Sequence, residues 1–243
     1  MQKNIWLATF LVAFYACTAT ATPTPFLFTV DPAQSLADVD VDAASAGFSD
    51  SDSDSTRLAG TFLALIDPEV APFSTARIVA MDVTNVDGLD MSLSFGGIFG
   101  AILNLAVESS DLEIHLTEPG GVGAVDGNGR FTQADNGLQL IAHATASCTG
   151  LLCGTVDLPP TFDVDDTTTV DFDNCRVTQT GQLTTLFIPV AATFEQVDND
   201  GNTLTFVLDG QLVGTGVAIP EPSGGLLLLM AAVAYLAIRP SRL

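Results

Sequence analysis

The sequence predicts an all-β fold, an antiparallel β-sandwich that is exported, with an N-terminal signal peptide and one C-terminal transmembrane helix. Short apolar stretches bounded by Gly, Asp, Asn and Pro recur through the middle of the chain, where helical periodicity is scarce. Longer apolar runs lie near both ends of the 243 residues. A hydrophobic content of 47% is enough for a sizeable buried core.

Residues 1–21 predict a secretory signal peptide. Lys3 gives a basic start, the apolar stretch 5–16 follows, and Ala19-Thr20-Ala21 offers small residues for cleavage. The apolar stretch is short for a bilayer span, so we expect cleavage after Ala21 rather than an uncleaved anchor. Lipid attachment at Cys17 is an alternative that the preceding residues disfavour.

Residues 22–56 form an acidic lead-in rich in Ser and Asp. The tract from Asp38 to Thr56 contains an alternating Ser-Asp run over 49–55. Because such a run buries little apolar area, we expect a surface loop or a mobile lead-in here.

Residues 57–218 are expected to form the β-sandwich domain. The stretch Phe95–Val107 fits a short helix about as well as a strand. The turn-rich residues 198–202 predict a C-terminal hairpin between the last two strands. Two stacked sheets would bury one face of each. The predicted strands are Thr61–Ile66, Arg77–Val83, Leu89–Phe95, Leu112–Thr117, Leu138–Ala146, Leu183–Phe194 and Thr203–Gly214.

Residues 219–243 predict a membrane tail. Pro220 and Pro222 prevent regular structure ahead of the apolar run 226–238, so a helix begins near Ser223. From there the helix would be about 24 Å long, slightly short of a hydrocarbon core of about 30 Å. Arg239 and Arg242 follow it, and the positive-inside rule keeps them cytoplasmic.

The order of these parts resembles the PEP-CTERM sorting tail of exported bacterial proteins. Pro220-Glu221-Pro222, a short apolar helix and terminal arginines carry the resemblance, which covers about the last tenth of the chain. The resemblance implies recognition by a membrane enzyme called an exosortase. It also implies a protein of the cell surface or extracellular matrix.

The charge of the chain excludes nucleic-acid binding. Lys3, Arg239 and Arg242 lie in the terminal segments, so the body from Thr22 to Ala218 has no lysine and only four arginines against 28 acidic residues. The body therefore carries a formal charge of −24, which repels phosphate backbones and anionic membrane surfaces.

Three cysteines remain after signal cleavage: Cys148, Cys153 and Cys175. Export places them in an oxidising compartment, so we expect one disulfide and one free thiol. The spacing does not decide which two pair. A metal-thiolate site is disfavoured because the paired Cys-x-x-Cys form is absent from the sequence.

The sequence does not predict an enzyme. Its two histidines, His115 and His143, each lie within a predicted strand, and no nucleophile elbow, zinc-protease helix or phosphate-binding loop motif occurs in the sequence. Paired carboxylates of a glycosidase stay open, because only the fold would bring them together.

No cofactor is expected, apart from weak calcium binding. Asp198, Asp200 and Asn202 alternate oxygen ligands around a glycine, but a closing bidentate Glu is missing, so an ordinary hairpin turn is the preferred interpretation. The same choice applies to the acidic runs 163–166 and 171–173.

These observations favour an exported, non-catalytic surface or extracellular-matrix protein. Its expected partners are the membrane through the C-terminal helix, an exosortase-type enzyme and matrix polysaccharide, with no nucleic acid. The alternative is a secreted carbohydrate-binding or glycan-hydrolysing domain. The body has no Trp or Tyr for stacking on sugars, only Phe, which disfavours this alternative.

Overall fold

The computed structural model describes residues 22–45, 48–97, 100–151, 153, 160–197 and 203–220. These residues form twelve β-strands and no helix, which confirms the all-β prediction. No described segment is a helix long and apolar enough to cross a membrane. The strands are β1 (Thr24–Val30), β2 (Leu36–Ser45), β3 (Phe48–Asp67), β4 (Thr75–Asn85), β5 (Leu89–Gly97), β6 (Gly100–Ser109), β7 (Glu113–Glu118), β8 (Gly123–Ala124), β9 (Arg130–Thr149), β10 (Thr161–Thr180), β11 (Leu183–Val197) and β12 (Thr203–Ala218).

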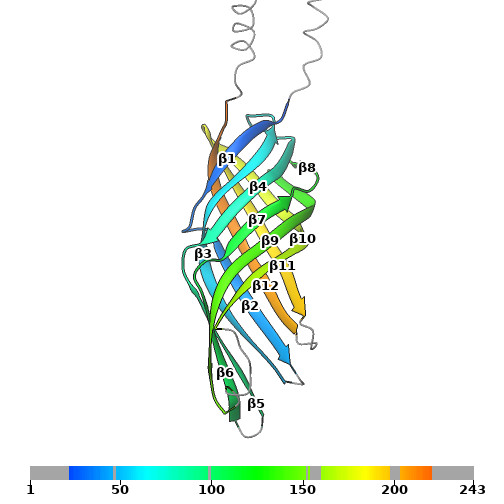
Figure 1. The fold of residues 1–243 in the computed structure, drawn as a ribbon. Coiled ribbons are helices and arrows are strands. Elements are labelled where there is room, and N and C mark those ends of the chain that lie inside the picture. The colour runs from blue at the N-terminus through cyan, green and yellow to red at the C-terminus, as the bar shows by residue number, and fades with distance from the viewer. Residues whose placement is uncertain are drawn as a thin grey trace, which may run out of the picture.

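One antiparallel sheet contains all twelve strands, and it closes on itself. From β1 the pairing runs through β3, β4, β7, β9, β10, β11 and β12, and β12 pairs with β1 again. Figure 1 shows β4, β7 and β9 in front of β11 and β12, with the two sets running in different directions.

The predicted two-sheet sandwich is therefore wrong in its pairing. The strands are long enough to change neighbours along their length: β3 pairs with β2 in its first part and with β1 in its second. Bent, twisted strands of this length link the two layers by hydrogen bonds, so the layers are parts of one sheet.

The core lies on the inner face of this closed sheet. Along β1 the side chains of Phe26, Phe28 and Val30 are buried, and those between them face outward. The rings of Phe28 and Phe62 stack with centroids 4.9 Å apart. Gly214 faces them from β12, where an added Cβ would lie 2.5 Å from the Phe62 ring. Glycine at this position makes room for the stacked rings.

The acidic tract is not a loop, contrary to the sequence prediction. It forms β2 and the first half of β3, which pair in register from Leu36↔Arg57 to Ser45↔Phe48. In β2 the buried residues Ala37, Val39 and Val41 alternate with exposed aspartates. The tract is thus a half-buried strand pair, and its high charge conceals the period-two pattern.

The seven predicted strands are confirmed. All seven predicted segments lie within or overlap observed strands, and β11 and β12 pair over fourteen residues from Thr184↔Gly216 to Val197↔Thr203 as the predicted hairpin. The described residues of the ambiguous stretch 95–107 belong to β5 and β6, which pair antiparallel.

Two bulges change which side chains face the core in the β9–β10 pair. The register shifts between Val170 and Phe172 and again between Phe172 and Cys175. Asp135 in β9 and Asn174 in β10 take positive φ angles of 59° and 57°. Each bulge adds one residue to its strand, so the alternation of inner and outer side chains reverses there while the pairing continues.

A buried amide completes the backbone pairing beside these bulges. Gln133 is fully buried; its Oε1 accepts a hydrogen bond from the Ile78 N–H at 2.6 Å, and its Nε2 donates to the Ile78 carbonyl at 2.9 Å. Asn136 accepts from Gln133 Nε2 at 2.6 Å and from the Gly120 N–H at 3.0 Å. Gln133 therefore occupies the place of a neighbouring strand's peptide group opposite Ile78.

Replacing this amide should destabilise the fold strongly. In Gln133→Ala both backbone groups of Ile78 lose their partner, and each unpaired buried group costs about 1–3 kcal/mol in the free energy of unfolding. The matched control is Gln139→Ala, because Gln139 lies on the outer face and bonds Asp165 at 2.6 Å. We expect the control to change by less than about 0.5 kcal/mol in urea unfolding. Equal effects of the two substitutions would contradict the assignment.

Candidate functional site

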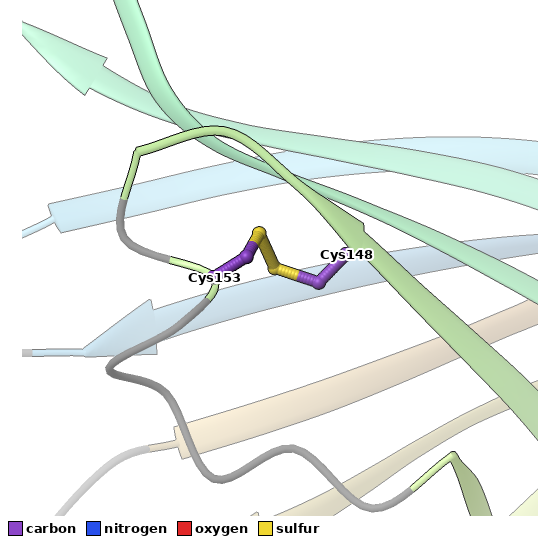
Figure 2. The surroundings of a disulfide bond; sticks show 2 residues. All are labelled: Cys148 and Cys153. Atoms are coloured by element: carbon purple, nitrogen blue, oxygen red, sulfur yellow. A yellow bond between two sulfur atoms is a disulfide. The ribbon is translucent and has the colours of Figure 1, made fainter.

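Two of the three cysteines in the body form a disulfide, as expected from the sequence. Cys148 near the end of β9 and Cys153 in the following loop form a disulfide with Cα atoms 5.7 Å apart (Figure 2). Of the pairings that the sequence left open, this one closes the shortest loop. A disulfide fits an oxidising compartment.

Cys175 is the free thiol, and it is fully buried in the core next to the β10 bulge. Its Sγ lies 3.5 Å from the Phe172 carbonyl. Burial, with a smaller effect of the Asp173 carboxylate, raises the pKa of Cys175 to about 12. The thiolate needed for nucleophilic attack or metal ligation is therefore strongly disfavoured.

Thiol counting checks this arrangement of cysteines. Because Cys175 is buried and protonated, we expect no reaction of the native body with a thiol reagent at about pH 8. Denaturation without reductant should expose one thiol, and denaturation with reductant three. A second thiol without reductant would show that Cys17 has been retained, and three would show that the disulfide is absent.

Most other predicted site residues lie outside the described residues. These are the calcium candidates Asp198, Asp200 and Asn202, the sorting residues Glu221 and Pro222, the tail arginines Arg239 and Arg242, and the signal peptide 1–21. Pro220 is the last described residue and is exposed. Within the described ranges no group of three or more His, Cys, Asp or Glu side chains could hold a metal ion, and this includes the acidic runs 163–166 and 171–173.

Both histidines are paired with carboxylates. His115 Nε2 lies 3.0 Å from Glu113, and its Nδ1 lies 3.5 Å from Asp82 on β4. His143 bonds Asp163, its cross-strand partner on β10. This hydrogen bond, with the nearby charges, raises the pKa of His143. These contacts explain both histidines as partners of acidic neighbours on the sheet.

Three aspartates of β3 form a ladder along the neighbouring strand β5. Asp54 Oδ2 accepts the Asp90 N–H at 2.8 Å, Asp52 Oδ2 accepts the Ser92 N–H at 2.6 Å, and Asp50 accepts the Ser94 N–H in the same way. Among the described strands, β5 pairs by its backbone only with β6. The period of two in the Ser-Asp run matches the spacing of N–H groups on one edge of a strand. This aspartate ladder thus attaches the β5–β6 hairpin to β3.

Removing the middle aspartate should free the Ser92 amide. In Asp52→Ala we expect hydrogen exchange at Ser92 to accelerate by about tenfold, because a hydrogen bond to a charged acceptor is lost. Asp40→Ala is the control, since Asp40 is exposed on the outer face of the paired strand β2. Unchanged exchange at Ser92 in Asp52→Ala would refute the ladder.

The four arginines of the body differ sharply in their surroundings. Arg57 forms an ion pair with Asp87 at 2.8 Å. Arg77 donates to the carbonyls of Gly120 at 2.7 Å and Pro119 at 3.0 Å. Arg130 and Arg176 are exposed, and the guanidinium groups of these two have no hydrogen bond or ion pair to any described residue.

Arg130 and Arg176 lie directly opposite each other and begin a row across the outer face. Arg130 on β9 pairs in register with Arg176 on β10, Arg176 with Phe187 on β11, and Phe187 with Val213 on β12. We call these four residues the outer-face row. They line a hollow of about 580 Å³ together with Gln34, Asn174, Thr178 and Thr185.

A tight turn and a bulge place the two arginines. Asp126 Oδ1 accepts the N–H groups of Asn128 and Arg130, each at 2.8 Å, and holds the turn before β9. Gly129 has φ of 78°, and an added Cβ would lie 2.2 Å from the Val177 carbonyl. The β10 bulge at Asn174 turns Arg176 outward. The arginine pair cannot be found from local sequence patterns, because it depends on the register of β9 against β10.

Comparisons with known proteins leave the family open. No protein-family model matches the chain, and no curated protein matches it. One matching solved structure is the open-gate state of the secretin InvG from the Salmonella SPI-1 type III secretion injectisome, residues 176 to the end. It is 9% identical over 90% of this chain and 67% of that chain, with a TM-score of 0.16. A TM-score this low supports neither a shared fold nor a shared function.

Proposed function

We propose that this chain is an exported, non-catalytic protein of the bacterial cell surface or extracellular matrix, delivered by a signal peptide and a PEP-CTERM-like tail. The observation that carries the proposal is the Cys148–Cys153 disulfide, because such bonds form and persist mainly outside the reducing cytosol. It comes from the body, so it is independent of the two terminal signals.

The surface of the body suits this role. Its −24 formal charge favours solubility and opposes association between copies. The ring of strands pairs β1 with β12, so these two strands leave no free edge that would invite pairing with other chains. The acidic hairpin β2–β3 has aspartates on both of its faces, and those on the outer face are exposed.

A carbohydrate-binding role is the second candidate. The observation that favours it is the outer-face row, which places Phe187 beside two arginines in a hollow that also contains hydroxyl and amide side chains. Sugar sites combine an apolar face with several hydrogen-bonding groups in this manner. The row and the hollow it lines offer such a combination on one sheet face.

Proteolysis of intact cells tests the proposed location. In a bacterium that has an exosortase-type enzyme, we expect added protease to digest the acidic body while a cytosolic marker stays intact. A variant with Pro220, Glu221 and Pro222 all changed to Ala should accumulate in the membrane fraction with its tail uncut, because the sorting motif is lost. A body that resists protease while other exterior proteins are digested, or a full-length chain in the cytosol, would overturn the proposal.

A further inference from the structure

We propose that Arg130 and Arg176 form a binding site for the carboxylate of an acidic sugar unit, whose ring rests on Phe187. The proposal uses the outer-face row and extends the second candidate function from carbohydrate in general to a carboxylated sugar. It rests on that candidate, and it does not depend on the route by which the protein leaves the cell.

The charge distribution is the first argument. The body has four arginines against 28 acidic residues, and two of the four occupy one cross-strand position. Directly opposed side chains have Cβ atoms about 4.5–5.5 Å apart, and like charges in such a pair destabilise a sheet. Neither guanidinium has a hydrogen bond or ion pair to a described residue, so an anion placed between them would offset this repulsion.

The neighbouring carboxylate of Asp126 does not supply that anion. Asp126 lies beside Arg130 along a neighbouring hollow. Its Oδ1 already accepts two backbone N–H groups in the turn before β9. These hydrogen bonds, with a smaller effect of the Arg130 charge, lower the pKa of Asp126. Asp126 thus fixes the backbone of Arg130 and forms no hydrogen bond or ion pair with its guanidinium group, which can contact an external ligand.

The chemical class of the ligand follows from the rest of the row. Two guanidinium groups match the two oxygens of a carboxylate. Phe187 is half-buried next to Arg176 and offers a ring face, while Gln34, Thr178 and Thr185 offer donors and acceptors for hydroxyl groups. A volume of about 580 Å³ is in the range of small-ligand sites. These features fit one sugar ring with a carboxylate and a neighbouring unit.

The overall negative charge of the body limits how many negative charges the ligand can carry. A body of −24 repels polyanions such as nucleic acid or heavily sulfated chains, while the row brings two arginines together. The ligand therefore presents one carboxylate at the row and mostly neutral groups beyond it. A uronic-acid unit within a neutral glycan has this character.

Binding of a defined sugar to the purified full-length protein tests the site. The probe is a disaccharide with one terminal uronic acid, compared with its uncharged methyl ester by calorimetric titration. We expect Arg176→Gln and Arg130→Gln each to weaken binding of the acid by about tenfold or more, because a charge-assisted hydrogen bond is lost. The methyl ester should bind the parent protein weakly and should not distinguish the variants.

Two controls separate a binding role from a structural one. Arg57→Gln removes the same charge from β3, a strand that pairs with neither β9 nor β10, and Arg57 does not line the hollow, so it should leave the affinity unchanged. Thermal unfolding of Arg176→Gln should show no loss of stability, because the substitution relieves repulsion. Phe187→Leu should weaken binding of the disaccharide more than binding of acetate, since only the sugar ring uses the aromatic face.

The outcomes that overturn the proposal are distinct. Equal affinity for the acid and its ester, unchanged affinity in both arginine variants, or a marked fall in the unfolding temperature of Arg176→Gln would each refute it. Equal affinity for acetate and the disaccharide would reduce the site to simple anion binding and would also refute it. None of these results bears on the location of the protein, which the proteolysis of intact cells tests separately.

Discussion

The structure depends on keeping backbone hydrogen bonds complete where strands separate. A closed sheet of bent strands cannot pair every peptide group with another strand, and an unpaired buried group is costly. Side chains supply the missing partners. Gln133 serves Ile78, and the aspartate ladder serves β5. Ser35 Oγ accepts the Val213 N–H at 2.9 Å in the same way. Polar residues that look superfluous in a β domain are thus part of its sheet.

Two kinds of like-charged pair face each other across strands on the outer face, and they differ in what they indicate about function. Asp38 on β2 lies opposite Asp209 on β12, which is an acid facing an acid. In a body with 28 acidic residues such a pair is expected from the composition alone. Arg130 facing Arg176 is not, because the body has only four arginines and the other two have carboxylate or carbonyl partners. A pair of opposed arginines, the rare charge, therefore points to a binding site, whereas a pair of opposed aspartates, the abundant charge, does not.

Local patterns in the sequence predicted much of the fold, and long-range pairing accounts for what they missed. The alternation in segments such as Leu112–Thr117 identifies strands because burial of one face leaves a period of two. The acidic tract was misassigned, since alternating Val and Asp in β2 and alternating Ser and Asp in β3 look like a solvated charge run. Closure of the sheet, the partner of Gln133 and the arginine pair all depend on register between segments far apart in the chain. The spacing of cysteines left the pairing of Cys148 open, and only the course of the chain after β9 decides it.

The paired bulges in β9 and β10 restrict how this hairpin can change in length over evolution. Loss of the extra residue at Asp135 or at Asn174 alone would shift one strand against the other, and buried side chains such as Phe131 or Cys175 would exchange places with their exposed neighbours. Loss of both together would restore the alignment of the strands, but beyond the bulges the inner and outer side chains of the hairpin would exchange faces. Insertions and deletions in homologous chains should therefore avoid these two positions and collect instead in the connections between strands.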